Sequence, residues 1–157
     1  MTNSSFHIQK ATIGDLNQIL QVFHNAVTIT ACEYYTPQQI NAWASTINST
    51  RNKWIHRIEN EAFIVAKSND DIVGFAALKG LSYFDLLFVA PGFGRRGVAS
   101  QMYDILEAKI PIGTILETHA SKVSMSFFLK KGFSVICQNK VDIQGVQIIN
   151  HSMHKQL

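Results

Sequence analysis

Apolar residues recur at helical spacing in the first third of the chain, after a short strand-like segment. Residues 6–10 predict a first strand. Thr12 and Asp15 then stand three residues apart, as in a capping box at the start of a helix. We expect the helix that follows to bury one apolar face, formed by Leu16, Ile19, Leu20, Phe23 and Val27.

Two further helices are predicted before the central strands. Thr36 and Pro37 open the first of them, because proline suits the first turn of a helix. Its apolar side consists of Ile40, Trp43 and Ala44. Arg51–Asn60 predicts a short third helix, with Trp54, Ile55 and Ile58 facing inward.

The middle of the chain predicts an antiparallel meander of three strands. Residues 62–67, 72–79 and 81–89 are apolar, and only the polar residues 68–71 and Gly80 separate them. Such short, turn-rich gaps fit hairpins, whereas parallel neighbours need a long crossover.

The last third continues with alternating elements. We expect a strand at residues 114–118, a helix around 122–131, a strand at 133–138 and a last strand near 147–153. Gly132 suits the end of the helix, since glycine adopts the left-handed conformation of a C-terminal cap.

A glycine-rich loop carrying two arginines joins the meander to the next helix. The strand that ends at Val89 runs into Gly92-Phe93-Gly94-Arg95-Arg96-Gly97, and an amphipathic helix opens at Gly97. The first N–H groups of a helix are unpaired and hold phosphates well, and arginine adds charge-assisted donors. This loop therefore predicts a site for a phosphorylated ligand.

Two kinds of protein carry such a loop. The sequence from Gly92 to Gly97 satisfies the G-x-G-x-x-G pattern of dinucleotide-binding oxidoreductases, and Glu117 follows roughly 20 residues later, where such proteins have a ribose-binding acid. That fold needs repeated parallel α/β units. Only about sixty residues follow Gly97 and the strands before it predict a meander, which makes this the less favoured interpretation.

The same loop resembles motif A of the GNAT acetyltransferase superfamily. Arg95-Arg96-Gly97-Val98-Ala99 follows Leu-Phe-Val-Ala-Pro, as in the motif Q/R-x-x-G-x-G/A after a strand. The segment from Phe127 to Phe133 resembles motif B, whose helix ends in glycine and phenylalanine. Residues 35–44 with 87–89 also resemble a bacterial subgroup of small, uncharacterised GNAT proteins. The resemblance spans nearly the whole chain.

The resemblance implies an α/β (α+β) GNAT-type acyl-CoA N-acyltransferase fold in a single domain over residues 1–157. Its mixed central sheet has an antiparallel N-terminal meander and is flanked by helices. The implied reaction moves an acetyl group from acetyl-CoA directly to an amine of a small molecule or peptide.

The resemblance also assigns the cofactor contacts. The strand residues Leu87, Phe88 and Val89 would pair with the pantetheine arm through their backbone. The pyrophosphate would lie against Arg95, Arg96, Gly97, Val98, Ala99 and Ser100.

Three positions depart from the family pattern. Gly94 stands where the motif has glutamine or arginine, so only its backbone can contribute. Ser121 replaces an asparagine and could instead cap the helix. Phe128 replaces the tyrosine that protonates the leaving thiolate in many GNAT enzymes, and it would pack beside the cofactor or in the core. Gly94 and Phe128 motivate a second hypothesis, a non-catalytic acyl-CoA sensor.

Candidate bases follow from the need to deprotonate the acceptor amine. Glu117 and His119 lie near the end of a predicted strand and share one face of it, and histidine titrates near neutral pH. Asp85 is a carboxylate in an apolar strand and needs a partner or a role. Tyr35 lies in the segment that walls the acceptor site by analogy, and Trp43 lines that site or packs in the core.

Composition narrows the function classes. The chain has 157 residues, is 46% hydrophobic and carries a net charge of +3, and its basic residues are scattered, which disfavours nucleic acid as a partner. No signal peptide or membrane span is expected, so we predict a cytoplasmic protein. Cys32 and Cys137 have no metal or redox spacing, and we expect reduced thiols, with Cys32 packed inside. Exposed apolar residues of the last strands could support a homodimer.

Overall fold

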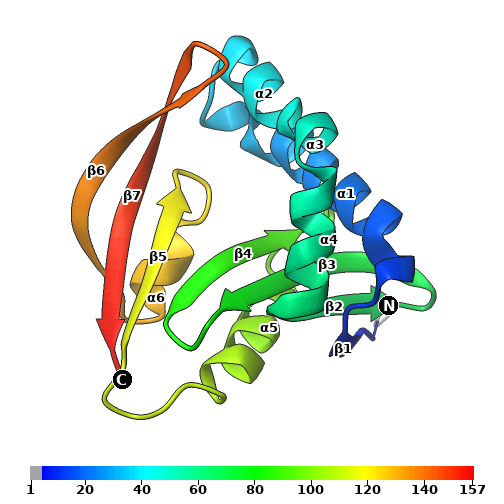
Figure 1. The fold of residues 1–157 in the computed structure, drawn as a ribbon, viewed down its shortest axis with the longest axis vertical. Coiled ribbons are helices and arrows are strands. Elements are labelled where there is room, and N and C mark those ends of the chain that lie inside the picture. The colour runs from blue at the N-terminus through cyan, green and yellow to red at the C-terminus, as the bar shows by residue number, and fades with distance from the viewer. Residues whose placement is uncertain (1–4) are drawn as a thin grey trace.

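The computed structural model describes residues 5–157, except for the side chains of residues 48 and 49. Its centre is a seven-stranded sheet in the order β1-β2-β3-β4-β5-β7-β6 (Figure 1). The strands are β1 His7–Lys10, β2 Ala62–Ser68, β3 Asp71–Lys79, β4 Tyr83–Val89, β5 Ile115–Ser121, β6 Ser134–Ile143 and β7 Val146–Gln156.

Neighbouring strands are antiparallel except for β4 and β5, which are parallel. The predicted meander is therefore confirmed, and the sheet is mixed. Because the strands of residues 5–157 include a single parallel pair, this part of the chain lacks the repeated parallel units of a dinucleotide-binding fold.

The hairpin of β6 and β7 is longer than the predicted strands. The two strands stay paired up to Ile143 and Val146, across a turn in which Gln144 and Gly145 have φ angles of 51° and 80°. Two residues with positive φ make the tight turn that matches strand twist. The sequence did not indicate this extension, because β6 is an exposed edge strand whose side chains lack a buried apolar face.

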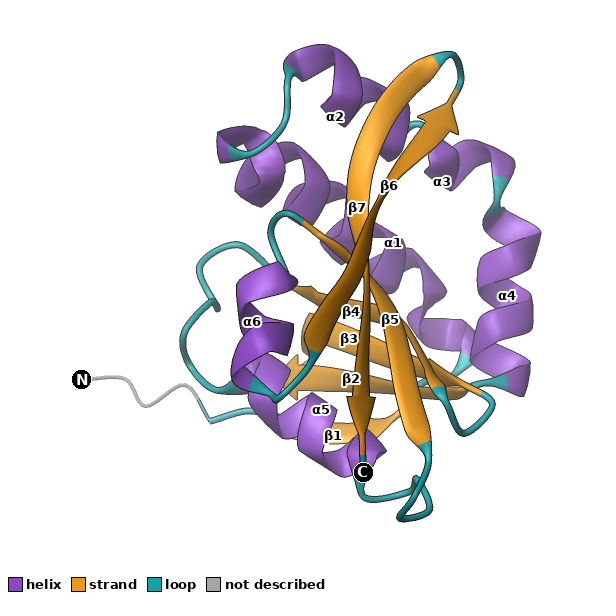
Figure 2. Ribbon diagram, turned by 90° about the vertical axis from the view of Figure 1, so that its left-hand side faces the viewer, coloured by secondary structure: helices purple, strands orange, loops and turns teal. Residues whose placement is uncertain are grey.

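Helices cover both faces of the sheet (Figure 2). They are α1 Leu16–Asn25, α2 Pro37–Ala44, α3 Thr46–Ser49, α4 Arg51–Asn60, α5 Val98–Glu107 and α6 Met125–Lys130, with short 3-10 turns at Ile13–Asp15 and Ala31–Glu33 and a π-helical turn at Ala26–Thr30. The first four lie on one face, whereas α5 and α6 lie on the other (Figure 2).

Local sequence signals explain where α1 and α2 begin. Asp15 accepts hydrogen bonds from the backbone N–H and hydroxyl of Thr12, at 2.9 and 3.2 Å. Burial acts to raise the pKa of Asp15, but these bonds and the ammonium of Lys67 outweigh it and lower the pKa. At α2 the Thr36 hydroxyl accepts from the Gln39 N–H at 3.2 Å, and Pro37 occupies the first turn. The predicted capping box at Thr12 and the predicted start of α2 at Pro37 are confirmed, and the capping box at Thr36 is an additional finding.

Each face of the sheet has its own apolar core. The core under α1, α2 and α4 includes Ile19, Val27 and Phe75, all fully buried, and the core under α5 and α6 includes Met102 and Leu106. Burial of two apolar layers is what fixes the sheet between the helices. In the described part of the chain, no helix is long and apolar enough to cross a membrane.

The expectation for Cys32 is wrong. Both cysteines are free and exposed, and the thiol of Cys32 donates to the carbonyl of Ile29 at 2.9 Å. Cys32 follows the π-helical turn, which rotates the next residues relative to the apolar face of α1, so that Ala31 is buried in place of the cysteine.

Candidate functional site

The strands β4 and β5 separate soon after they meet. Their parallel pairing is limited to Tyr83 with Glu117 and Phe84 with Thr118, and the Thr118 hydroxyl donates to the Phe84 carbonyl at 3.0 Å. Beyond Phe84, β4 pairs only with β3 among the described residues. The other edge of residues 86–89 is thus open to an extended ligand, which could add as a strand. The predicted pantetheine residues Leu87, Phe88 and Val89 lie there.

A β-bulge directs Asp85 toward the helices. The pairing of β3 and β4 shifts at this point, since Leu78 pairs with Phe84 whereas Ala77 pairs with Leu86. Asp85 is the extra residue, and an extra residue reverses the alternation of side chains along a strand. Phe84 therefore packs on the α5 side, whereas Leu86 packs on the α1 side. Bulges of this kind are frequent next to active sites.

The glycine-rich loop turns sharply at the end of β4. Gly92, Arg95 and Gly97 have φ angles of 87°, 59° and 81°, which glycine adopts without strain and arginine rarely does. Arg95 and Arg96 are exposed, and the Arg96 guanidinium lies 5.1 Å from the centre of the Phe93 ring. The loop thus presents two positive charges to solvent.

The N-terminus of α5 completes this loop. Gly97 is its N-cap, and the Gln101 N–H donates to the Gly97 carbonyl at 2.9 Å. The N–H groups before Gln101 have no intrahelical acceptor. They belong to the predicted pyrophosphate residues Val98, Ala99 and Ser100. Gly94 contributes only backbone, and a Cβ there would meet no atom within 4 Å.

Close packing at Gly74 holds α5 in position. A Cβ on this β3 residue would lie 3.1 Å from Met102, from Val98 and from the Phe88 carbonyl oxygen. Only glycine lets the first turns of α5 approach β3 and β4 this closely without a shift. The helix N-terminus therefore lies beside the open edge of β4.

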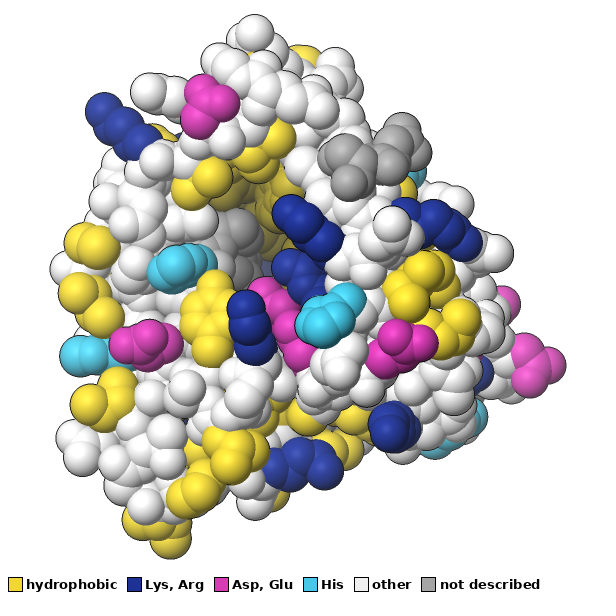
Figure 3. All heavy atoms as spheres, in the orientation of Figure 1, with side chains coloured by type: hydrophobic (Ala, Val, Ile, Leu, Met, Phe, Trp, Pro, Cys, Tyr) yellow, Lys and Arg dark blue, Asp and Glu magenta, His cyan; other side chains and the backbone are white. Residues whose placement is uncertain are grey.

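A cavity of about 360 Å³ lies between the helices α1, α2 and α4 and the strands β4, β5 and β7. Figure 3 shows it as a hollow lined by hydrophobic side chains, with basic, acidic and histidine side chains beside it. The lining includes the aromatic residues Phe23, Tyr35, Trp43, Trp54 and Phe88 and the polar residues Lys53, Arg57, Asp85, His119 and Ser121. An aromatic pocket with a few polar groups is typical of a small-molecule site.

At this cavity, Asp85 forms an ion pair with Arg57. Arg57 donates from Nε to Asp85 Oδ2 at 2.9 Å, and its guanidinium lies 5.3 Å from the centre of the Trp54 ring. The Asp85 side chain is 13% exposed. The carboxylate is thus largely buried, paired with an arginine, and in contact with the cavity.

Glu61, which sequence reasoning missed, lies beside Asp85. Its Oε2 atom is buried and has no hydrogen-bond partner among the described residues. Burial, the negative charge of Asp85 and hydrogen bonding with Asp85 raise the pKa of Glu61 to about 7, against the opposing charges of Arg57 and Lys79. No sequence signal marks this residue, which directly follows a helix; only its tertiary neighbours distinguish it.

The two candidates on β5 share one face, as predicted, but differ in position. His119 lines the cavity, and its ring centre lies 5.6 Å from that of Tyr83. Glu117 lies opposite Tyr83 in the sheet and is not part of the cavity lining. Of the two side chains, His119 is therefore the one placed to meet a ligand there.

Tyr35 is buried and already engaged. Its hydroxyl accepts from the Lys122 N–H at 2.9 Å and donates to the Ile149 carbonyl at 3.2 Å. Burial raises its pKa, although the bond from Lys122 acts against this. Trp43 packs edge-on against Tyr35, lies against the core and also lines the cavity.

Phe128 follows its predicted alternative, whereas Ser121 does not cap α6, whose N-cap is Ser124. Phe128 is buried in the core under α5 and α6, where its ring contacts Tyr103 and Phe133. Ser121 accepts a hydrogen bond from the Ser124 N–H at 3.3 Å, next to the start of α6, and it also borders the cavity.

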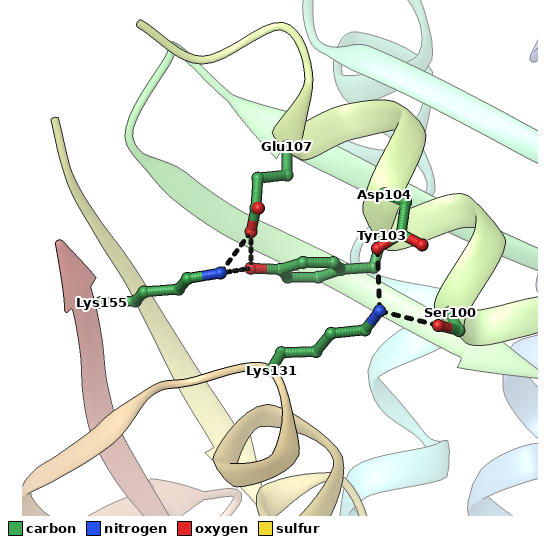
Figure 4. Close-up of polar contacts among 6 residues, drawn as sticks. All are labelled: Ser100, Tyr103, Asp104, Glu107, Lys131 and Lys155. Atoms are coloured by element: carbon green, nitrogen blue, oxygen red, sulfur yellow. Dashed lines mark hydrogen bonds and ion pairs between the residues drawn. The ribbon is translucent and has the colours of Figure 1, made fainter. Parts of the chain in front are cut away.

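A second polar cluster surrounds Tyr103 on the opposite side of the sheet (Figure 4). Lys131 donates to Ser100 and Asp104 at 2.7 and 2.8 Å. Lys155 donates to Glu107 at 2.8 Å and to the Tyr103 hydroxyl at 3.4 Å, and that hydroxyl donates to Glu107. The Lys131 and Lys155 ammonium groups lie 5.0 and 5.6 Å from the centre of the Tyr103 ring. This cluster ties α5 to the end of α6 and to β7.

Comparison with known proteins identifies the family. The sequence model of the Acetyltransferase (GNAT) domain matches residues 31–156. The uncharacterized N-acetyltransferase YafP of Escherichia coli (strain K12) is 35% identical over 150 residues, which cover 96% of this chain and 95% of that protein.

Solved structures agree. A GCN5-related N-acetyltransferase from Rhodopseudomonas palustris superposes with a TM-score of 0.89 at 28% identity, covering 100% of this chain and 99% of the other. The PaiA N-acetyltransferase from Thermoplasma acidophilum superposes with a TM-score of 0.74 at 20% identity, covering 98% and 99% of the two chains. On the evidence of the family match and the YafP relative, the chain belongs to the GNAT acetyltransferase family.

Proposed function

We propose that residues 1–157 form one N-acetyltransferase domain that moves an acetyl group from acetyl-CoA to an amine. This proposal rests on one observation, the separation of β4 from β5. The separation leaves an opening between the glycine-rich loop and the aromatic cavity. The PaiA structure is a complex with coenzyme A, and a yncA structure from Salmonella typhimurium holds acetyl-CoA; both support this cofactor for the same fold.

The cofactor would enter from the loop side. Its pyrophosphate would bind the first N–H groups of α5 together with Arg95 and Arg96, because a helix N-terminus and guanidinium groups both favour phosphate. The pantetheine arm would pair with the open edge of residues 87–89. The thioester would then reach the cavity near Asp85 and His119.

The acceptor amine would bind in the cavity. Aromatic side chains offer an apolar surface for the body of the acceptor, and Asp85 attracts its ammonium group. The bound amine must lose a proton before it attacks the thioester, and Asp85 and His119 are the candidate bases that line the cavity. Glu117 and Tyr35 are less favoured as the base, since Glu117 lies outside the cavity lining and the Tyr35 hydroxyl already donates a hydrogen bond to the Ile149 carbonyl.

The leaving group needs little help from a side chain. Phe128 cannot donate a proton and is buried in the core. A thiol with an ordinary pKa of about 8.5 leaves readily as the thiolate near neutral pH. Positioning of the amine would then provide much of the rate.

Release of free thiol tests this function. The protein is incubated with acetyl-CoA and a panel of arylalkylamines, aliphatic amines and peptides, and the coenzyme A formed is measured with a thiol reagent. Amine-dependent release is expected. A sensor would gain thermal stability from acetyl-CoA yet release no thiol, and an oxidoreductase would gain it from NAD(H) instead.

Two further expectations from the sequence stay predictions. Val135 and Ile136 on the edge strand β6 are 44% and 54% exposed, which gives a homodimer an apolar surface to use. The cytoplasmic location is likewise a prediction.

A further inference from the structure

The carboxyl group of Glu61 occupies an unusual environment for an acid. Glu61 directly follows α4, and its Oε2 atom is buried with no donor among the described residues. The Asp85 carboxyl group, which is another acceptor, acts on Glu61 both by its negative charge and by hydrogen bonding. A buried oxygen without a donor is costly, unless a proton on one of the two carboxyl groups supplies the missing bond.

The charges around this pair come from three elements. Asp85 belongs to β4 and accepts from Arg57 of α4, while the positive charge of Lys79 at the end of β3 has a smaller, opposing effect on Glu61. Tyr83 is also near, since the charges of both Asp85 and Arg57 act on its hydroxyl. The single guanidinium bonded to Asp85 leaves Oε2 of Glu61 without a donor.

Two adjacent carboxyl groups titrate as one unit. When like charges lie at hydrogen-bond range, the first proton binds tightly and is shared, so that the pair carries one negative charge over a broad pH range. One member of the pair, Asp85, lines the cavity, whereas Glu61 is absent from the lining. The pair therefore connects a ligand-facing carboxylate to a second oxygen that can hold a proton.

We propose that Glu61 and Asp85 form a carboxyl pair that removes the proton of the acceptor amine, with Asp85 in contact with the amine and Glu61 as its positioning residue. This inference rests on the proposed acetyl transfer. Arg57 holds the Asp85 carboxyl group at the cavity through its hydrogen bond, and Glu61 holds the shared proton.

The reaction balances with the pair as the base. The ammonium form of the acceptor gives one proton to the doubly ionised pair, which then shares it. The neutral nitrogen attacks the thioester carbon, a C–N bond forms, and the C–S bond breaks. The second proton lost by the nitrogen ends on the departing thiolate, and the pair returns its proton to water.

A carboxyl titration tests the pair without any acceptor. Protein with 13C-labelled Asp and Glu carboxyl groups is titrated by NMR, and the Glu61→Gln variant identifies the Glu61 signal. We expect that signal to titrate near pH 7 in the parent protein and well below it in Asp85→Asn. The exposed Glu59, on the helix that Glu61 directly follows, is the matched control, and Glu59→Gln should leave the Glu61 signal unchanged. Titration of Glu61 at the ordinary pH of a glutamate would overturn the pair.

A pH–rate profile tests the proton transfer. With phenethylamine or another amine of the panel that reacts, kcat/KM is measured from pH 6 to 9 and corrected for ionisation of the amine itself. Glu61→Gln should lower kcat/KM about tenfold to a hundredfold at pH 8, a typical contribution of acid–base catalysis, and should remove the limb near pH 7. Glu59→Gln should match the parent protein.

The outcomes separate the two proposals. A Glu61→Gln variant that keeps the limb overturns the proton transfer while acetylation stands. If acetyl-CoA and every amine of the panel fail to react, the acetyl transfer itself is overturned, and this inference with it. Normal folding of Glu61→Gln is checked by its circular dichroism, and Asp85→Asn provides the second variant, which must lose the same limb.

Discussion

The clusters around Tyr103 and around Asp85 are built from the same kinds of groups and are paired differently. Each has carboxylates and a cation over an aromatic ring: Lys131 and Lys155 over Tyr103, and Arg57 over Trp54. Around Tyr103 each ammonium has a carboxylate partner and the hydroxyl is bonded (Figure 4). Around Asp85 a buried oxygen of Glu61 has no partner among the described residues.

Under the proposed function, the Tyr103 cluster holds elements together, whereas the Asp85 cluster takes part in the chemistry. A fully paired polar network fixes the elements it joins, whereas a buried polar atom without a partner costs stability and needs another explanation. The position of each cluster agrees with this division. The Tyr103 cluster joins α5 to α6 and β7, whereas Asp85 faces the aromatic cavity.

The largest effect is expected at Asp85. Asp85→Asn keeps an acceptor for Arg57 but removes the charge that would bind and deprotonate the amine. Loss of a general base typically costs 10²–10⁴-fold, so kcat/KM for the amine should fall by at least about a hundredfold. The matched substitution in the other cluster, Asp104→Asn, should change kcat/KM less than threefold. Similar losses of kcat/KM in Asp85→Asn and Asp104→Asn would contradict a functional difference between the two clusters.

The next effect concerns the cations of the glycine-rich loop. Arg95 and Arg96 are exposed at the helix N-terminus, whereas Lys131 is bound to Asp104. Each charge-assisted bond is worth about 1.5–3 kcal/mol, so the double variant Arg95→Ala/Arg96→Ala should raise the KM for acetyl-CoA tenfold or more. The KM for the amine should stay nearly constant. Lys131→Met should instead lower the melting temperature and leave the KM for acetyl-CoA within about twofold. An unchanged KM for acetyl-CoA in the double variant would refute the role of the loop.

A smaller effect is expected from removal of the Tyr103 hydroxyl. In Tyr103→Phe the ring stays in the core, and Lys155 and Glu107 keep their own ion pair. The free energy of unfolding should fall by about 1 kcal/mol, the net contribution of one hydrogen bond. Urea denaturation measures this, and kcat/KM should be unchanged. A loss of activity without a loss of stability would contradict a purely structural Tyr103 cluster.

Sequence analysis predicted the parts of the molecule that local signals determine. The capping box at Thr12, the start of α2 at Pro37 and the apolar spacing of α1 depend on residues within four positions of one another. The loop from Gly92 to Gly97 was found for the same reason. Strand alternation predicted the shared face of Glu117 and His119.

Other features depend on residues that meet only in the folded chain. The bulge at Asp85 arises from pairing with β3, and Glu61 becomes unusual only because Asp85 lies beside it. Lys155 and Tyr103 are 52 positions apart and lie on different elements. No local pattern could have joined these residues, which is why the sequence marked Asp85 as needing a partner without naming Arg57 or Glu61.

The smallest expected effect is a pH dependence of thermal stability that distinguishes the Asp85 cluster from the Tyr103 cluster. Because burial and Asp85 raise the pKa of Glu61 from 4.5 to about 7, the folded protein holds a proton that the unfolded chain releases between these values. The stabilising contribution of this proton is complete below pH 4.5 and is lost as the pH rises through 7. Glu61→Gln has no such proton to lose. The melting temperature of Glu61→Gln minus that of the parent protein should therefore be a few degrees greater at pH 8 than at pH 5. Glu59→Gln should show the same difference from the parent protein at both pH values, and so should Asp104→Asn in the paired cluster. A constant offset for Glu61→Gln at pH 5 and 8 would mean that the Glu61 carboxyl group of the parent protein does not change its protonation between these pH values.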